Sequence, residues 1–425
     1  MDTSLPPACE RTPEEVWNVV HAFVADYALD THLSVPWRHD EPRDQLRDIM
    51  SSSDLLDRLH QSRRDVLSVM RVCKSWRDLA LPHLHTTLAF STQSSVELLA
   101  DHLEASRKVR KHGLGWYTRE VLVFLPSYTD SEGLRDRTAR SLTRVVRCCR
   151  RLETYVTYAA GMLAEPREVM LAIPDTLRHL HWISSGPGFG SWSQVLSRAH
   201  GLRTLGMTTL YAPSDALESP PPDLSNLHSL VLNGGAPGSD GLFKALATWD
   251  LPALRAVSIS MPFWPRSSAT TLEFLERHGA QVQSLCVPGG LGMRGNVVER
   301  ILQLCPNITT LSFTPNHRYA QGVTPRPAHA NVTSVGIRSA FDNMAGVRVD
   351  TIPLWTEVFE HFDAVRFPRL RQLRMTTITE GLLKHDSGAD EAGGRGARYR
   401  ARGWTRTSTA GRSAMAFVSL NINGI

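Results

Sequence analysis

The sequence predicts an α/β solenoid in which a helical N-terminal motif precedes a curved parallel sheet with outer helices. Three observations predict this fold. A spaced apolar pattern recurs about every 25 residues, stretches with helical periodicity lie between its copies, and an apolar helical pattern with capping signals precedes the first copy. A chain of 425 residues could form two or three compact domains, but this rhythm favours one elongated repeat array.

The repeated pattern is apolar-x-x-apolar-x-apolar, and successive copies start 25, 25, 25, 27, 28, 26, 24 and 38 residues apart. Seven of these steps fall within the ~20–29 residues typical of strand-and-helix repeats. The long last step predicts an insertion around residues 352–362. The copies begin at Leu152, Leu177, Leu202, Leu227, Leu254, Val282, Ile308, Val332 and Leu370.

Each copy alternates apolar and polar residues and therefore predicts a short strand with one buried side. Helical apolar stripes precede several copies, over residues 141–152, 271–282 and 296–305. One such unit cannot bury its apolar face alone, so stacking is expected, with the strands on the concave side. Over roughly residues 150–380 the chain resembles irregular leucine-rich-repeat proteins. The Asn or Cys usual after the strand is mostly missing, which argues against regular asparagine ladders.

The N-terminal segment predicts helices. Thr12 suits an N-cap, Pro13 the first helical position, and Glu15 completes a capping box. A polar insertion near residues 30–60 interrupts the apolar pattern. The pattern resumes over residues 66–80, and Pro82 is expected to close that helix.

The run Val72-Cys73-Lys74-Ser75-Trp76-Arg77-Asp78-Leu79-Ala80 resembles the closing run of the F-box, a family that opens with a Pro-Glu-apolar helix. The resemblance covers residues 12–90, and the chain is similar overall to F-box proteins of mushroom-forming fungi. Two departures are that Thr12 replaces the usual Leu and that about 40 residues separate the two halves. An F-box followed by leucine-rich repeats is itself a recurring architecture.

This resemblance implies the substrate-recognition subunit of an SCF-type cullin ubiquitin ligase, whose F-box docks the SCF adaptor protein while the repeats bind a substrate protein. The alternative is a leucine-rich-repeat scaffold or interaction module without a ligase link, in which residues 12–90 only cap the repeats. Under the first interpretation the adaptor-binding residues are Pro13, Val16, Trp17, Val20, Val72, Cys73, Trp76 and Leu79.

The strand positions that alternate with the buried ones are the candidate substrate-binding residues. Most of them are small and polar, so they suit hydrogen bonding to a protein partner but do not identify it. A solvated sheet face without a ligand is the competing interpretation. The candidates are His179, His181, Thr204, Ser229, Asn233, Ser258, Ser260, Ser284, Thr310, Ser312, Ser334, Arg338, Gln372 and Arg374.

Charge and cysteine usage exclude several classes. Residues 384–425 hold seven Lys and Arg against three Asp and Glu, a net +4 of the chain's +5, which argues against a nucleic-acid partner for the folded part. Six scattered Cys without a C-x-x-C pair fit a reducing compartment, cytoplasmic or nuclear. No secretory signal and no apolar run of about 18 residues is present, so no membrane association is expected.

The sequence contains no complete catalytic, cofactor-binding or metal-binding motif, so we expect neither an enzyme nor a cofactor or metal site. The Gly290-Leu291-Gly292-Met293-Arg294-Gly295 loop lacks the downstream acidic residue that a dinucleotide site needs. His179 and His181 share a strand face but lack a third ligand. The expected organisation is a disordered N-terminus over 1–11, an F-box-like motif over 12–90, a solenoid over 91–383 and a disordered basic tail over 384–425.

Overall fold

The computed structural model describes residues 53–125, 132–157, 166–182, 189–208, 222–233, 240–260, 267–287, 295–313, 328–338, 367–378, 405–407 and 416–421. It divides into two units, residues 1–253 and 254–425, which we describe separately. In both units parallel strands alternate with helices, so the prediction of a repetitive α/β fold with a parallel sheet is confirmed at that level.

The described part of the first unit opens with a helical hairpin of α5 (Ser53–Met70) and α6 (Lys74–Leu84). The prediction of one helix over 66–80 closed by Pro82 is wrong. The chain breaks after Met70, and Cys73 caps α6 in an extended conformation, its sulfur accepting the Trp76 N–H at 3.4 Å. Pro82 lies inside α6. Helix α5 also begins within the range expected to be a polar insertion.

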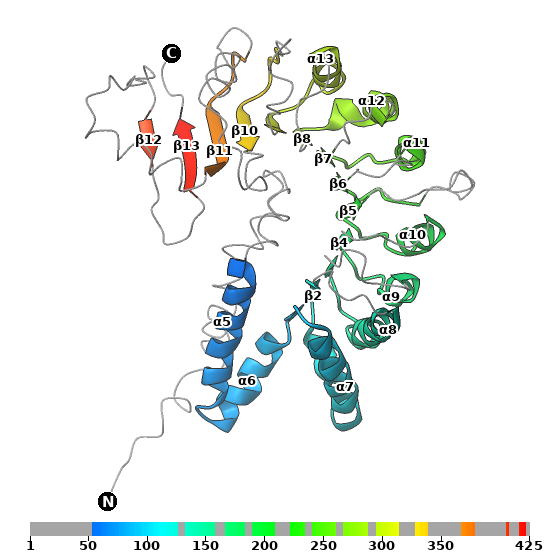
Figure 1. Ribbon diagram of the computed structural model, residues 1–425, viewed down its shortest axis with the longest axis vertical. Coiled ribbons are helices and arrows are strands. Elements are labelled where there is room, and N and C mark those ends of the chain that lie inside the picture. Colours follow the sequence, from blue (N-terminus) through cyan, green and yellow to red (C-terminus); the bar gives the residue numbers. More distant parts are fainter. Residues whose placement is uncertain are drawn as a thin grey trace, which may run out of the picture. The chain divides into compact units, whose positions relative to one another are not determined.

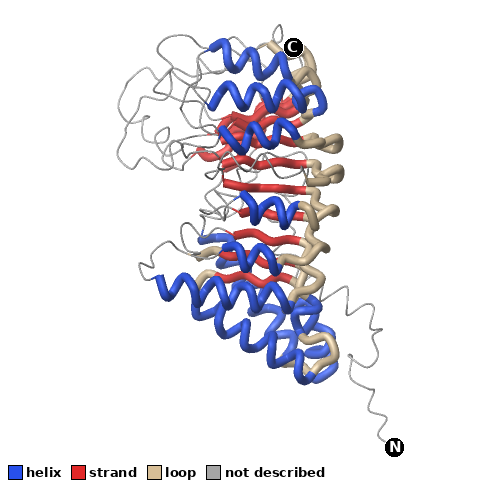
Figure 2. Tube along the Cα trace, turned by 90° about the vertical axis from the view of Figure 1, so that its right-hand side faces the viewer, coloured by secondary structure: helices blue, strands red, loops and turns tan. Residues whose placement is uncertain are grey.

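Six strands follow in the first unit, each paired in parallel with the next. They are β1 (Thr87–Phe90), β2 (Glu120–Val123), β3 (Thr154–Thr157), β4 (His179–Trp182), β5 (Thr204–Thr208) and β6 (Ser229–Asn233). The intervening helices lie together on one side of the strands (Figures 1 and 2). They are α7 (Gln93–Val109), the short 3-10 helix η1 (Leu114–Tyr117), α8 (Glu132–Cys148), α9 (Pro166–Ala172), α10 (Phe189–Leu196) and α11 (Asp240–Thr248).

The second unit repeats this plan. Its parallel strands are β7 (Ala256–Ser260), β8 (Ser284–Val287), β9 (Thr310–Phe313), β10 (Ser334–Arg338) and β11 (Gln372–Ile378), with α12 (Ser267–His278), the 3-10 helix η3 (Gly279–Gln281) and α13 (Gly295–Leu304) between them. Strand β13 (Ala416–Asn421) pairs antiparallel with β11, and β12 (Thr405–Thr407) with β13 (Figure 1). The expectation of disorder over 384–425 does not hold for these two strands. The expected insertion at 352–362 lies outside the described residues.

The core of each unit forms from aligned strand positions. In the first unit the register sets Tyr155 beside Leu180 and Leu180 beside Leu205, and all three side chains are completely buried. In the second unit Leu285, Leu311 and Val335 form the corresponding row. The apolar sequence pattern therefore marks the strand side that packs against the helices, as predicted.

A backbone ladder ties successive repeats together where the chain enters each strand. The Glu153 carbonyl accepts the N–H groups of Arg178 and His179 at 2.8 and 2.9 Å, and the Arg178 carbonyl accepts those of Arg203 and Thr204 at 2.7 and 3.0 Å. One carbonyl oxygen thus accepts hydrogen bonds from two backbone N–H groups of the next repeat. These bonds pair buried backbone groups that the short strands would otherwise leave unpaired.

Side chains add a second ladder at the residue directly before the first apolar position of a repeat. Asn226 donates to the His200 carbonyl at 3.0 Å, and Asn331 donates to the Pro306 carbonyl at 2.9 Å. Thr176 donates to the Leu152 carbonyl at 2.8 Å. Regular asparagine ladders were not expected after the strands. The hydrogen bonds of the Asn226 and Asn331 side chains lie before the strands instead.

His85, which caps the C-terminus of α6, makes folding of the first unit sensitive to pH. Its side chain is 6% exposed and stacks on His102 at 6.1 Å between ring centroids. Burial, together with the nearby His102, Arg63 and Arg110, lowers the pKa of His85 from 6.5 to about 4. The folded state therefore disfavours the protonated ring.

We expect the free energy of unfolding to fall between pH 6.5 and pH 4. The unfolded chain binds the proton at the ordinary pKa, whereas the folded chain binds it only near pH 4, so His85 opposes folding by about 3 kcal/mol once both are protonated. Urea unfolding at several pH values checks this. In a His85→Gln variant this part of the pH dependence should vanish; an unchanged slope between pH 6.5 and 4 would assign it to other groups.

Candidate functional site

The end of the α5–α6 hairpin presents apolar side chains to solvent. Val72, in the turn between the helices, is 60% exposed, and Leu67 on α5 is 42% exposed. Cys73, Trp76 and Leu79 are half-buried. Four of the residues predicted to bind an adaptor therefore lie together on the turn and on α6. They are Val72, Cys73, Trp76 and Leu79. The other four, Pro13, Val16, Trp17 and Val20, lie outside the described residues.

The two helices hold each other by a small core rather than by the exposed residues. Val66 of α5 and Ala80 of α6 are buried, and Val69, Met70 and Leu84 pack against them. Because Val72 takes no part in this core, its exposure is not required for hairpin packing. Exposed apolar side chains at a helix turn are suitable anchors for a partner surface.

The predicted substrate-binding positions line up on the other strand side. In the first unit the register sets His179, Thr204 and Ser229 side by side, and the His179 ring nitrogen Nδ1 lies 3.1 Å from the Thr204 hydroxyl. In the second unit Ser284, Thr310, Ser334 and Gln372 form one row, and the Ser334 hydroxyl donates to Gln372 Oε1 at 3.5 Å. The strand register therefore aligns these residues in one row within each unit.

Many of these side chains have little solvent access, which sequence reasoning did not anticipate. The buried ones are His181, Thr204, Ser229, Ser258, Ser284 and Ser312, whereas His179, Thr310, Ser334 and Gln372 are half-buried. Asn233, Ser260, Arg338 and Arg374 belong to strands, but their side chains lie outside the described set. Within the described side chains, the half-buried ones are those that a partner could reach.

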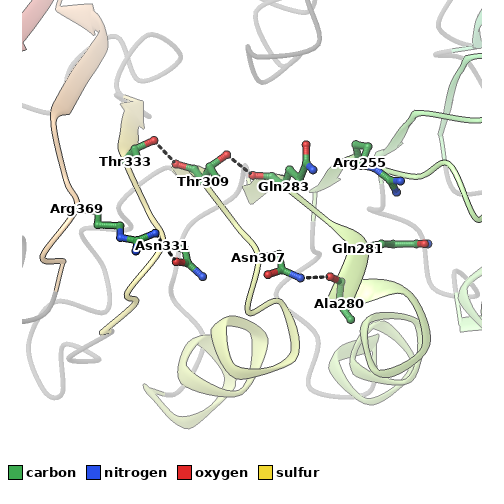
Figure 3. Close-up of a pocket in the computed structure, with 9 residues that line it drawn as sticks. All are labelled: Arg255, Ala280, Gln281, Gln283, Asn307, Thr309, Asn331, Thr333 and Arg369. Atoms are coloured by element: carbon green, nitrogen blue, oxygen red, sulfur yellow. Dashed lines mark hydrogen bonds between the residues drawn. The ribbon is translucent and has the colours of Figure 1, made fainter.

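A shallow polar furrow of about 530 Å³ lies on the second unit where the chain enters its strands (Figure 3). Sequence reasoning missed it. Amide and hydroxyl side chains line it, with Arg255 and Arg369 at opposite ends of the labelled residues in the close-up. The full lining is Arg255, Ala280, Gln281, Gln283, Asn307, Thr309, Asn331, Thr333 and Arg369.

Hydrogen bonds between repeats hold the furrow in shape. Asn307 donates to the Ala280 carbonyl at 2.6 Å, and the Thr309 hydroxyl donates to the Gln283 carbonyl at 3.2 Å. Arg369 donates to Asn331 Oδ1 at 3.2 Å. The furrow therefore offers pre-positioned polar groups for hydrogen bonding, and its lining contains no acid, histidine or cysteine to act in catalysis. The sequence signal for it was the polar residue directly before the first apolar position of the last four repeats, namely Gln281, Asn307, Asn331 and Arg369.

Three buried thiols are not poised for chemistry. Burial raises the pKa of Cys149, Cys286 and Cys305 to about 12, so these thiols stay protonated at neutral pH and are poor nucleophiles. Across the residues that the structure describes, no group of three His, Cys, Asp or Glu side chains could hold a metal ion. The glycine loop at 290–294 lies outside them.

No helix in the described ranges is both long enough and apolar enough to cross a membrane. No protein-family model and no curated protein matches the chain.

Proposed function

We propose that the chain is the substrate-recognition subunit of an SCF-type cullin ubiquitin ligase. In this proposal the α5–α6 hairpin contributes to docking the SCF adaptor, and the strand units bind a substrate protein. The observation that carries the proposal is the 60% exposure of Val72, which begins the run over residues 72–80 that resembles the F-box. An apolar residue that the hairpin core does not use is available to a partner.

The order of the elements supports the same division of labour. The hairpin precedes the parallel strands, and its second helix lies against η1, so it is joined to the repeats of the first unit rather than separated by a linker. Strand faces and furrows built from many short units provide extended surfaces for a protein ligand. The described residues provide hydrogen-bonding groups there and no nucleophile–base pair.

The experiment is an affinity measurement between the purified full-length chain and an SCF adaptor protein. Replacing Val72 with Asp places a charge at the exposed turn, and we expect the Kd to rise about tenfold or more, as for loss of an interface anchor. Because Val72 is outside the hairpin core, the thermal unfolding midpoint should change little. Adaptor binding by the unaltered chain and its loss in this variant are both required.

Leu98→Asp is the matched control. Leu98 is 71% exposed and lies on α7, outside the hairpin, so the same substitution there should leave adaptor affinity unchanged. Equal weakening by both variants, or no binding by the unaltered chain, would reject the ligase assignment.

The alternative is a repeat scaffold in which the hairpin is only a cap. Its support is that Arg63 of α5 donates to the Thr87 carbonyl at the start of β1, at 3.4 Å, and that α6 lies against η1. A terminal cap is what a stacked array needs. This alternative predicts that Val72→Asp and Leu98→Asp behave alike and that no adaptor is bound.

A further inference from the structure

One stretch of the chain carries more positive charge than the whole. Residues 105–205 contain 16 Lys and Arg against eight Asp and Glu, a net charge of +8, whereas the full chain has +5. Acidic residues elsewhere in the chain offset this local excess. The interpretation of the folded part as electrically even is therefore wrong for this stretch.

The fold gathers much of this charge on one edge of the first unit. All six strands are parallel, so the helix ends and the connections that lead into the strands lie along the same edge. The Arg203 N–H donates to the Arg178 carbonyl at 2.7 Å, which places these two residues about 5 Å apart in adjacent repeats. We name as the basic edge Arg107, Lys108, Arg147, Arg150, Arg178 and Arg203.

These six side chains are all exposed. No ion pair identified among the described residues involves any of them. The nearby acids are engaged elsewhere: Glu153 pairs with Arg119 at 2.7 Å, and Glu104 pairs with Arg144 at 2.6 Å. Asp175, also exposed on this edge, offsets one charge. A surplus of unpaired cations therefore faces solvent.

Stability of the fold explains only part of this arrangement. Arg107 and Lys108 lie in the last turn of α7 and Arg147 in that of α8, where cations favour the helix dipole. Arg178 and Arg203 instead lie directly before β4 and β5, and two like charges on neighbouring strands repel each other. In the second unit the same repeat position holds Arg255 and Arg371, but also Gln283, Thr309 and Thr333, so the fold does not need arginine there.

We propose that the basic edge binds an acidic segment of a partner protein. Charge complementarity supplies the attraction, and the row of exposed guanidinium groups suits carboxylates. A single-stranded nucleic acid would also need exposed rings on which bases could stack. The large ring of Trp116 already stacks on His112 at 4.6 Å and lies beneath Arg151 at 5.0 Å, so it is occupied and a protein partner is favoured. This proposal does not depend on adaptor binding.

The test is fluorescence anisotropy of the full-length chain with a labelled oligo-glutamate peptide and, separately, with a single-stranded and a duplex RNA of equal charge. We expect the peptide to bind, with affinity falling as salt screens the charges. The double variant Arg178→Glu, Arg203→Glu should bind the peptide about tenfold more weakly or worse. The double variant Arg178→Gln, Arg203→Gln should lose less.

The control is the double variant Arg137→Glu, Arg140→Glu. Both residues are exposed and belong to the same unit, but they lie at the middle of α8 or before it, about two helical turns or more from Arg147. It has the same net charge as the first variant and should retain peptide binding. An equal loss in the control pair, or no peptide binding by the unaltered chain, would overturn the proposal. Tighter binding of either RNA than of the peptide would overturn the assignment to a protein partner.

Discussion

Replacing Trp182 with alanine should lower the free energy of unfolding by about 3 kcal/mol. The Trp182 side chain is completely buried between the strands and helices of the first unit. Its ring stacks on Tyr155 at 5.8 Å and meets Trp192 edge-on at 6.4 Å between centroids. Truncation would leave a cavity bordered by two aromatic rings that cannot easily collapse into it.

The indole N–H of Trp182 moderates this loss. It is buried, and among the described residues it has no hydrogen-bond partner, so its removal also eliminates an unpaired donor. For this reason the expected loss lies near the lower end of the range for tryptophan truncation. Trp182→Phe, which keeps a ring and removes the N–H, should cost less than about 1.5 kcal/mol.

Urea unfolding of the full chain measures these effects, and Leu98→Ala is the control. Leu98 is 71% exposed, so its truncation should change stability by less than about 0.5 kcal/mol. If Trp182→Ala were as mild as Leu98→Ala, the packing of Trp182 of β4 between Tyr155 of β3 and Trp192 of α10 would not be as described.

Gly279→Ala should destabilise the second unit by about 2 kcal/mol, in the range of overpacking substitutions. Elsewhere a glycine replaced by alanine in a helical segment gains up to about 1 kcal/mol. At Gly279, however, the new Cβ would lie 2.4 Å from the carbonyl oxygen of Leu304 and 3.0 Å from Cys305 Sγ. A backbone carbonyl at the end of α13 cannot move aside without shifting the next repeat.

Gly201→Ala is the matched control for this substitution. Gly201 also lies between a helix and a strand, but its new Cβ would approach no atom closer than the Leu177 carbonyl oxygen at 3.8 Å, an ordinary contact. We expect its thermal midpoint to be unchanged or slightly raised. Equal destabilisation by both alanines would mean that helix-to-strand glycines are needed for their backbone freedom and not for close approach.

The repeat from β3 onward could be predicted because its signal is local. Three apolar residues within six positions suffice to mark a strand with a buried side, as Leu177, Leu180 and Trp182 do for β4. Strands β1 and β2 were missed because their units are longer. Leu88, Val121 and Tyr155 align across the sheet but lie 33 and 34 residues apart, since α7 and α8 each span 17 residues.

The helical hairpin shows a different limit of sequence reasoning. The apolar pattern over residues 66–80 continues smoothly through the turn, so periodicity alone predicted one helix. The interruption depends on Cys73 adopting an extended backbone and accepting the Trp76 N–H. Cysteine is an unusual residue at such a position, and the resemblance to the F-box named the residues without revealing where the chain turns.

The sequence by itself determined which strand side is apolar and that parallel strands alternate with helices, because burial of apolar side chains follows a short periodicity along the chain. Only the tertiary structure decided which polar residues remain exposed. Arg178 and Arg203 are 25 residues apart, and the furrow from Arg255 to Arg369 spans several repeats. Such neighbours are created by strand register and stacking, which no single stretch of sequence specifies.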